Sequence, residues 1–151
     1  MSITAETYIL AAEEHLTAAQ ELYHPQGRYV LSHYVAGLAV ECMLRAYRVR
    51  LDPEFDSRHD LQELYKLARF GDVVPDHQQE KIGAALGTIV LQWSNNHRFR
   101  SEDALRAWLR KKGLHQGIKG DFVKERTRRI INSAADIVTV GVGRWKILSK
   151  N

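Results

Sequence analysis

The stretch that decides the fold covers residues 29–50 and reads YVLSHYVAGLAVECMLRAYRVR. Nearly every turn of this stretch offers apolar side chains on more than one face, which is the pattern of a helix at the centre of a bundle. One carboxylate, that of Glu41, falls among them. A buried carboxylate without a partner costs on the order of several kcal/mol. We therefore expect Glu41 to be a structural polar centre that accepts bonds from Arg98, His59 or a tyrosine hydroxyl.

The composition is that of one soluble globular domain. The chain has 151 residues, of which 44% are hydrophobic and 26% are charged, and this length is enough for a sizeable core. Its apolar stretches are too short to span a bilayer, and residues 1–27 hold four glutamates with no Lys or Arg, the wrong charge for a targeting peptide. The single cysteine, Cys42, excludes an internal disulfide. We expect a cytoplasmic protein without membrane attachment.

Charge is distributed unevenly along the chain. Residues 97–151 hold 14 basic and 5 acidic side chains, whereas residues 1–27 carry a net charge of −4 and residues 28–96 a net charge of −1. An anionic partner would therefore dock on the last third of the chain. The alternative is a solvated basic face that binds no ligand.

Apolar periodicity and helix-end signals predict an all-α protein, an up-and-down bundle of four to five main helices with a short C-terminal tail. Ser57 and Asp60 are typical of a capping box, and Gly71 is expected to end the helix that follows. The expected helices cover residues 4–23, 28–50, 57–70 and 75–93, then a short helix capped by Ser101 and a long final helix capped by Asp121. The whole chain, 1–151, forms one domain, with the bundle over 4–138 and the tail over 139–151.

Three segments, in this order, resemble the HEPN superfamily. Ala39-x-Glu41-x-x-Leu44-Arg45-Ala46 is similar to its second-helix signature, and His59-Asp60-Leu61-x-x-Leu64 to the segment that follows. Trp93 with Arg98-Phe99 resembles an element of the nucleotidyltransferase-associated branch. The likeness covers about residues 5–137.

The resemblance implies a helical bundle that is often a homodimer. It also implies partners in RNA metabolism, toxin–antitoxin pairs or defence systems, or a nucleotidyltransferase protein on which the domain docks. Many catalytic members are metal-independent ribonucleases, in which an Arg is followed four to six residues later by a His near the start of the last core helix. In these members the His performs acid–base chemistry and the Arg stabilises the charge on the phosphorane.

Two Arg-x4-His matches occur, and neither fits that pattern. Arg28 and His33 lie at the start of the second helix, and their five-residue separation does not place both on one face. Arg110 and His115 are separated by Gly113, which is expected to end the helix between them. We therefore assign no catalytic residue and expect no enzymatic activity. The alternative is a ribonuclease toxin that uses Arg110 with His115, or His97 with Arg98.

The loop from His97 to Arg100 and the basic run after it are the candidate site for RNA or a nucleotide. Guanidiniums, exposed amides and an aromatic ring can together hold a phosphate and stack a base. The predicted binding residues are His97, Arg98, Arg100, Arg110, Lys111 and Lys112. In the structural alternative, Phe99 packs into the core and Arg98 pairs with a carboxylate. We favour this alternative for Phe99 and leave both open for Arg98.

No metal or cofactor site is expected. No two histidines stand four residues apart on one helix, there is no cysteine pair, and Asp52-x-Glu54-x-Asp56 lacks the glycine and terminal glutamate of a calcium loop. A phosphate-binding P-loop is also missing. The leading hypothesis is a domain that binds RNA or a nucleotide or docks on a nucleotidyltransferase. A ribonuclease and a structural homodimerisation module are the alternatives.

Overall fold

The protein is an all-α bundle in the computed structural model, which describes residues 3–24, 27–58 and 60–150. This part of the chain contains no strand, as the sequence predicted. The helices are α1 (Ala5–Leu22), α2 (Tyr29–Leu51), α3 (Leu61–Leu67), α4 (Phe70–Val73), η1 (Asp76–Gln78), α5 (Gln79–Gln92), η2 (Asn95–Phe99), α6 (Glu102–Lys111) and α7 (Phe122–Leu148). None of these described helices has the combination of length and apolar character needed to cross a membrane.

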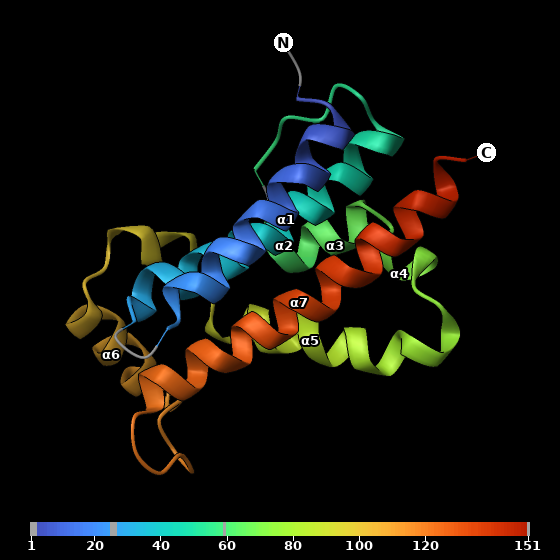
Figure 1. The fold of residues 1–151 in the computed structure, drawn as a ribbon. Coiled ribbons are helices and arrows are strands. Elements are labelled where there is room, and N and C mark those ends of the chain that lie inside the picture. The colour runs from blue at the N-terminus through green and yellow to red at the C-terminus, as the bar shows by residue number, and fades with distance from the viewer. Residues whose placement is uncertain (1–2, 25–26, 59, 151) are drawn as a thin grey trace.

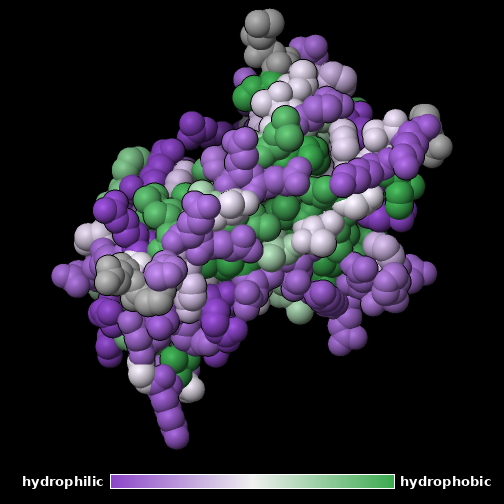
Figure 2. Space-filling view, in the orientation of Figure 1, coloured by the Kyte–Doolittle hydropathy of each residue, from purple (hydrophilic) through white to green (hydrophobic). Residues whose placement is uncertain are grey.

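Helix α2 runs through the middle of the bundle, which confirms the prediction from its apolar faces. It packs against α1, α7, α3, η2 and α6, and α7 also packs against α5 (Figure 1). Most of its residues between Ser32 and Val49 are buried. Apolar residues gather in the middle of the face shown in Figure 2, and hydrophilic residues surround them.

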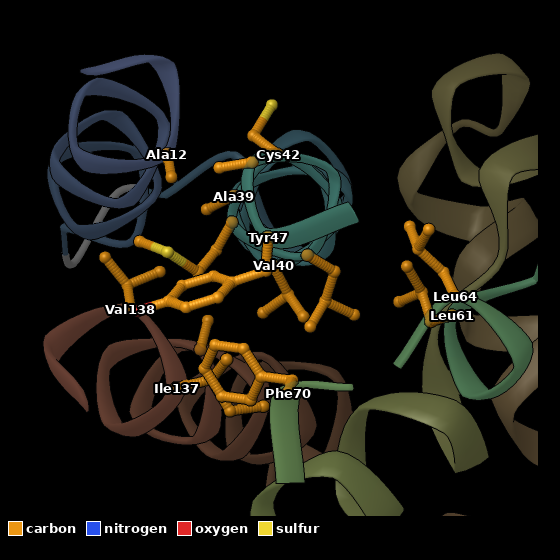
Figure 3. Close-up of a cluster of buried hydrophobic side chains, with 14 of the residues drawn as sticks. Ala12, Ala39, Val40, Cys42, Tyr47, Leu61, Leu64, Phe70, Ile137 and Val138 are labelled. Carbon is orange, nitrogen blue, oxygen red and sulfur yellow. The ribbon is translucent and has the colours of Figure 1, made fainter. Parts of the chain in front are cut away.

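The core between α2 and α7 is centred on Tyr47, whose ring points from α2 toward α7 (Figure 3). The ring meets Phe70 and Trp145 edge-on, with centroids 5.0 and 5.2 Å away. Its hydroxyl donates a 2.8 Å hydrogen bond to the carbonyl of Gly141, and burial raises the pKa of Tyr47 to about 12. One aromatic side chain thus joins α2, α4 and α7.

Helices α6 and α7 begin at the caps that the sequence predicted, whereas a tertiary contact stabilises the start of α2. Ser101 caps α6 and Asp121 caps α7, each through a side-chain oxygen that accepts an amide three residues ahead. Among the residues that the structure describes, no side chain caps helix α2 from its own N-cap position. Instead, a carboxylate oxygen of Glu102, at the start of α6, accepts the amide of Val30 at 2.9 Å.

Three predicted boundaries were wrong. The cap of α3 is Asp60 itself, which accepts the amide of Glu63, so the helix does not begin at Ser57. The break after α3 lies at Arg69, whose φ of 53° is left-handed, whereas Gly71 continues within α4. The segment expected as a tail, residues 139–151, is helical as far as Leu148. Helix α7 continues past residue 138, and Gly141 in this continuation is buried.

Replacing Tyr47 with Phe tests the bond that joins α2 to α7. We expect Tyr47→Phe to lower the free energy of unfolding by about 1–2 kcal/mol, because the buried carbonyl of Gly141 loses its side-chain donor while the ring contacts remain. Urea denaturation measures this change. The control is Tyr8→Phe, on α1, which the same measurement should find within about 0.5 kcal/mol of the parent.

Candidate functional site

The loop after α5 is fixed by two buried histidines. The Nε2 atoms of His33 and His97 both donate to the backbone carbonyl of Gln92, at 2.7 and 3.0 Å, and the two rings meet edge-on. The ring of His97 also meets Trp108 of α6 edge-on, with centroids 4.6 Å apart. The carbonyl at the end of α5 therefore joins α2 to η2. The contact between His97 and Trp108 joins α6 to them.

Both histidines are held neutral by their surroundings. Burial, with a smaller contribution from the neighbouring His97, lowers the pKa of His33 to about 3. Burial also lowers the pKa of His97 to about 4. The Nδ1 atom of His97 accepts a 3.1 Å bond from the guanidinium of Arg100, which requires the neutral ring. His97 is only 1% exposed, so this predicted binding residue has almost no surface to offer a nucleic acid.

The prediction that Phe99 packs into the core was wrong. The side chain is 75% exposed, the largest fraction among the exposed large hydrophobic residues of the described chain. The guanidinium of Arg98 lies 4.6 Å from the centre of its ring. Because the histidine anchors one side of the short η2 turn in the interior, Phe99 points outward. The pair is an exposed aromatic face with a positive charge on it.

Helix α6 adds further cations, and several of them lie over aromatic rings. The ammonium of Lys112 and the guanidinium of Arg100 lie 4.8 and 5.4 Å from the ring centre of Trp108. Arg106 and Arg110 approach the ring of Phe122 in the same way. The predicted residues Arg110, Lys111 and Lys112 are all exposed, whereas Arg100 is partly buried by its contacts. We call Arg98, Phe99, Arg110, Lys111 and Lys112 the η2–α6 surface.

A cavity of about 620 Å³ lies between α2, the start of α3, the end of α5 and η2. Its lining includes Glu41, Arg45, Arg58 and Arg98. The carboxylate of Glu41 pairs with Arg45 of its own helix at 3.3 Å, and not with Arg98 as expected, although Arg98 lies at the same cavity. The side chain of Glu41 is 24% exposed, so it stands at the cavity wall. His59, its other predicted partner, lies outside the described residues.

Comparison with known proteins gives one match. The model of the HEPN domain family matches residues 5–145, which is nearly the whole chain. The protein belongs to the HEPN family. No curated protein and no solved structure matches it. The resemblance seen in the sequence is thereby confirmed for the family, and the nucleotidyltransferase-associated branch stays a prediction.

The Arg-x4-His pairs of this HEPN domain lie in different surroundings. His33 is fully buried on α2, whereas Arg28 precedes that helix and is exposed. Arg110 and His115 both lie near the ring of Phe122, and Gly113, with a φ of 74°, ends α6 between them. His97 is bonded to the guanidinium of Arg100 and to the carbonyl of Gln92. Neither spacing thus presents an exposed histidine and arginine side by side on one helix.

Sequence reasoning missed several residues of the candidate site. Arg58 and Tyr34 line the cavity, and Trp108 joins α6 to His97. A signal for Trp108 was present, because Lys112 follows it at four residues on an amphipathic helix. Arg58 stands in a short loop without periodicity, so nothing in the sequence marked it. Among the described residues, no group of three or more His, Cys, Asp or Glu side chains lies close enough to hold a metal ion.

Proposed function

We propose that this HEPN domain binds single-stranded RNA on the η2–α6 surface. The observation that carries the proposal is Phe99, 75% exposed with the guanidinium of Arg98 over its ring. Exposing an aromatic side chain of this size to water is unfavourable. An unstacked base can cover such a ring, and an adjacent cation can hold its phosphate.

The charge of α6 favours the same ligand. Arg110, Lys111 and Lys112 are exposed on α6 and belong to the last third of the chain, which carries a net charge of +9. Cations along a strand bind successive phosphates and make affinity strongly dependent on salt. Family membership adds support, because the HEPN fold is consistent with functions that involve RNA or nucleotides. We place a base on Phe99 and the flanking phosphates on Arg98 and the α6 cations.

Removing the aromatic face tests the stacking part of this proposal. We expect Phe99→Ala to weaken binding of a single-stranded RNA oligonucleotide about 5-fold to 100-fold, the loss of one stacked base. Fluorescence anisotropy with a labelled oligonucleotide measures the affinity. The matched control is Leu10→Ala on α1, which also removes an exposed apolar side chain (62% exposed) and should leave the affinity unchanged. Equal affinities for all three proteins would contradict stacking at Phe99.

Removing two cations tests the electrostatic part. We expect Lys111→Ala with Lys112→Ala to weaken binding and to reduce the slope of log K against log salt by about 1.4, because each phosphate contact on a single strand contributes about 0.7. The control with the same charge change is Lys146→Ala with Lys150→Ala, in the last turn of α7 and just after it, where affinity and slope should stay constant.

The parent protein also decides between this proposal and its two alternatives. RNA recovered intact after the titration is the expected result. RNA shortened without added metal would instead point to the ribonuclease. An absence of RNA binding even at low salt would favour the homodimerisation module and overturn the proposal.

A further inference from the structure

A groove lies near the C-terminal end of α7, where this helix faces η1 and the first turn of α5. Figure 1 shows that α5 and α7 diverge toward this end. The groove has a volume of about 400 Å³, within the range of small-molecule sites in proteins, about 300–1,000 Å³. Its α7 wall includes five residues spaced three or four apart, so that they share one helix face: Asp136, Val140, Gly143, Arg144 and Ile147.

This groove contains an arginine without a counter-ion. Among the described residues, no carboxylate lies at ion-pair distance from Arg144, because Asp136 is paired with Lys81 of α5 at 3.5 Å. The Nε atom of Arg144 is shielded from solvent and has no hydrogen-bond partner in the described part of the chain. Its lost hydration is therefore not replaced by the protein. The charge is delocalised over the guanidinium, so an anion bound to the terminal nitrogens would compensate the whole group.

The charges of the groove fit a carboxylate better than a phosphate. Those of Lys81, Asp136 and Arg144 sum to +1. A phosphate monoester carries about −1.5 to −2 at neutral pH and would bring excess negative charge close to Asp136. A carboxylate carries a single negative charge, and its two oxygens match the planar fork of a guanidinium. The hydroxyl of Thr139, which also lines the groove, can donate a further bond to it.

Apolar side chains flank Arg144 on its own helix. Val140 precedes it by four residues and Ile147 follows it by three, so the three are neighbours on the groove side of α7. Ile147 is 50% exposed, and covering an apolar side chain is favourable. Pro75 lies on the opposite wall. The apolar body of a ligand can contact these side chains while its carboxylate lies on Arg144.

Gly143 keeps this part of the groove open. Nothing lies within 4 Å of the position that its Cβ would take, so no neighbouring side chain requires glycine there. Glycine is less favourable than alanine inside a helix. Because Gly143 lines the groove beside Arg144, a side chain at this position would occupy the space next to the guanidinium. The glycine therefore leaves room for a ligand at some cost in helix stability.

We infer that this groove binds a small monocarboxylic acid, with its carboxylate on Arg144 and its aliphatic or aromatic body against Val140 and Ile147. The C-terminal carboxylate of a peptide with an apolar last residue offers the same chemistry. The inference goes beyond RNA binding. At about 1.5 Å per residue, about 30 Å of α7 separate Arg144 from Phe122, the ring beside Arg110 of the η2–α6 surface.

Titration of the whole protein with hexanoate, followed by NMR of the backbone amides, tests this inference. We expect shift changes at residues 75–81 and 135–147, which surround the groove. Hexanoate should bind at least about 10-fold more tightly than acetate, which lacks the apolar body, and than hexanamide, which lacks the charge. Equal affinities for hexanoate and hexanamide, or an absence of shift changes around the groove, would overturn the inference.

Two variants test the two halves of the site. Arg144→Gln should weaken hexanoate binding at least about 10-fold, the loss of a charge-assisted contact. Gly143→Leu should abolish binding, because its side chain fills the groove and has free space in which to fold. The matched controls are Arg129→Gln, at another exposed arginine of α7, and Gly87→Leu, at a helical glycine of α5 that also has free space around it. Hexanoate binding by Gly143→Leu as tight as by the control Gly87→Leu would contradict the site.

A short peptide ending in leucine separates the two sources of the carboxylate. If its free-acid form binds more tightly than hexanoate, and amidation of its C-terminus or Gly143→Leu removes the binding, the ligand is the end of a polypeptide. If hexanoate binds and the peptide does not, the ligand is a free acid. Lys111→Ala with Lys112→Ala should leave hexanoate binding unchanged, so the failure of either proposal can be recognised independently of the other.

Discussion

Gly37→Ala is expected to lower the free energy of unfolding by about 3 kcal/mol, although alanine is the better helix former. The added Cβ would overlap the indole ring of Trp93, which packs directly on the backbone of α2. Displacing that ring also breaks its bond to the carbonyl of Tyr34. Against this loss, the gain in helix propensity is only about 1 kcal/mol. For a chain of this size, the midpoint of thermal unfolding should fall by about 6–12 °C.

The other helical glycines provide matched controls for this prediction. Gly87 lies on α5 with nothing near its Cβ position, so Gly87→Ala should raise stability by about 0.5–1 kcal/mol. At Gly141 the added Cβ would meet the side chain of Met43, which is flexible and can move, so the loss there should be smaller than at Gly37. If Gly37→Ala is as stable as Gly87→Ala, Trp93 does not occupy this slot in solution.

Mild acid should destabilise the protein far more than its surface charges predict. The pKa of His33 is lowered to about 3 and that of His97 to about 4, both mainly by burial, whereas in the unfolded chain both histidines titrate near 6.5. Between these values the unfolded state binds protons that the folded state does not bind. Stability is therefore complete above pH 6.5 and falls as the pH falls toward 4. Each histidine contributes a slope of about 1.4 kcal/mol per pH unit, on the order of 3 kcal/mol by pH 4.

Urea denaturation at several pH values between 6 and 5 measures this slope. The window lies above the range of carboxylates, including Glu125, whose bond to Arg128 lowers its pKa. His97→Gln removes one titrating ring and should roughly halve the slope. The matched control is His77→Gln, an exposed histidine on η1. An equal change of slope in both variants would contradict the assignment to the buried pair.

The surroundings of these histidines explain why His97 was predicted as a binding residue. Its sequence context, between asparagines and arginines, is that of a polar loop. The partners that bury it come from elsewhere: His33 from α2, the carbonyl of Gln92 from α5 and Trp108 from α6. Burial of a loop residue depends on such distant contacts, and no local pattern reports them. The exposure of Phe99 follows from the same anchor, because neighbouring residues in a short turn point in different directions.

Glu41 shows the opposite case, in which the local pattern was informative. A carboxylate within an apolar helix has to find a partner, and the structure supplies Arg45 one turn away. From the sequence we expected Arg98, His59 or a tyrosine hydroxyl as the partner of Glu41, and we did not name Arg45. In the tertiary structure Arg98 and Arg58 line the same cavity as Glu41. The distance along the chain between residues 41, 58 and 98 hides this proximity from any reading of spacing.

Periodicity and end signals by themselves determined that the chain is helical, that the helix over residues 29–50 lies at the centre, and that Ser101 and Asp121 begin helices. These features depend on contacts within a few residues and on which helix faces are apolar, and the local sequence determines both. Only the tertiary structure decided which loop residues are buried, that α7 continues to Leu148, and that two arginines meet Glu41 and Trp93 around one cavity. Those outcomes depend on how helices distant in sequence pack against one another, which fixes the neighbours of each side chain.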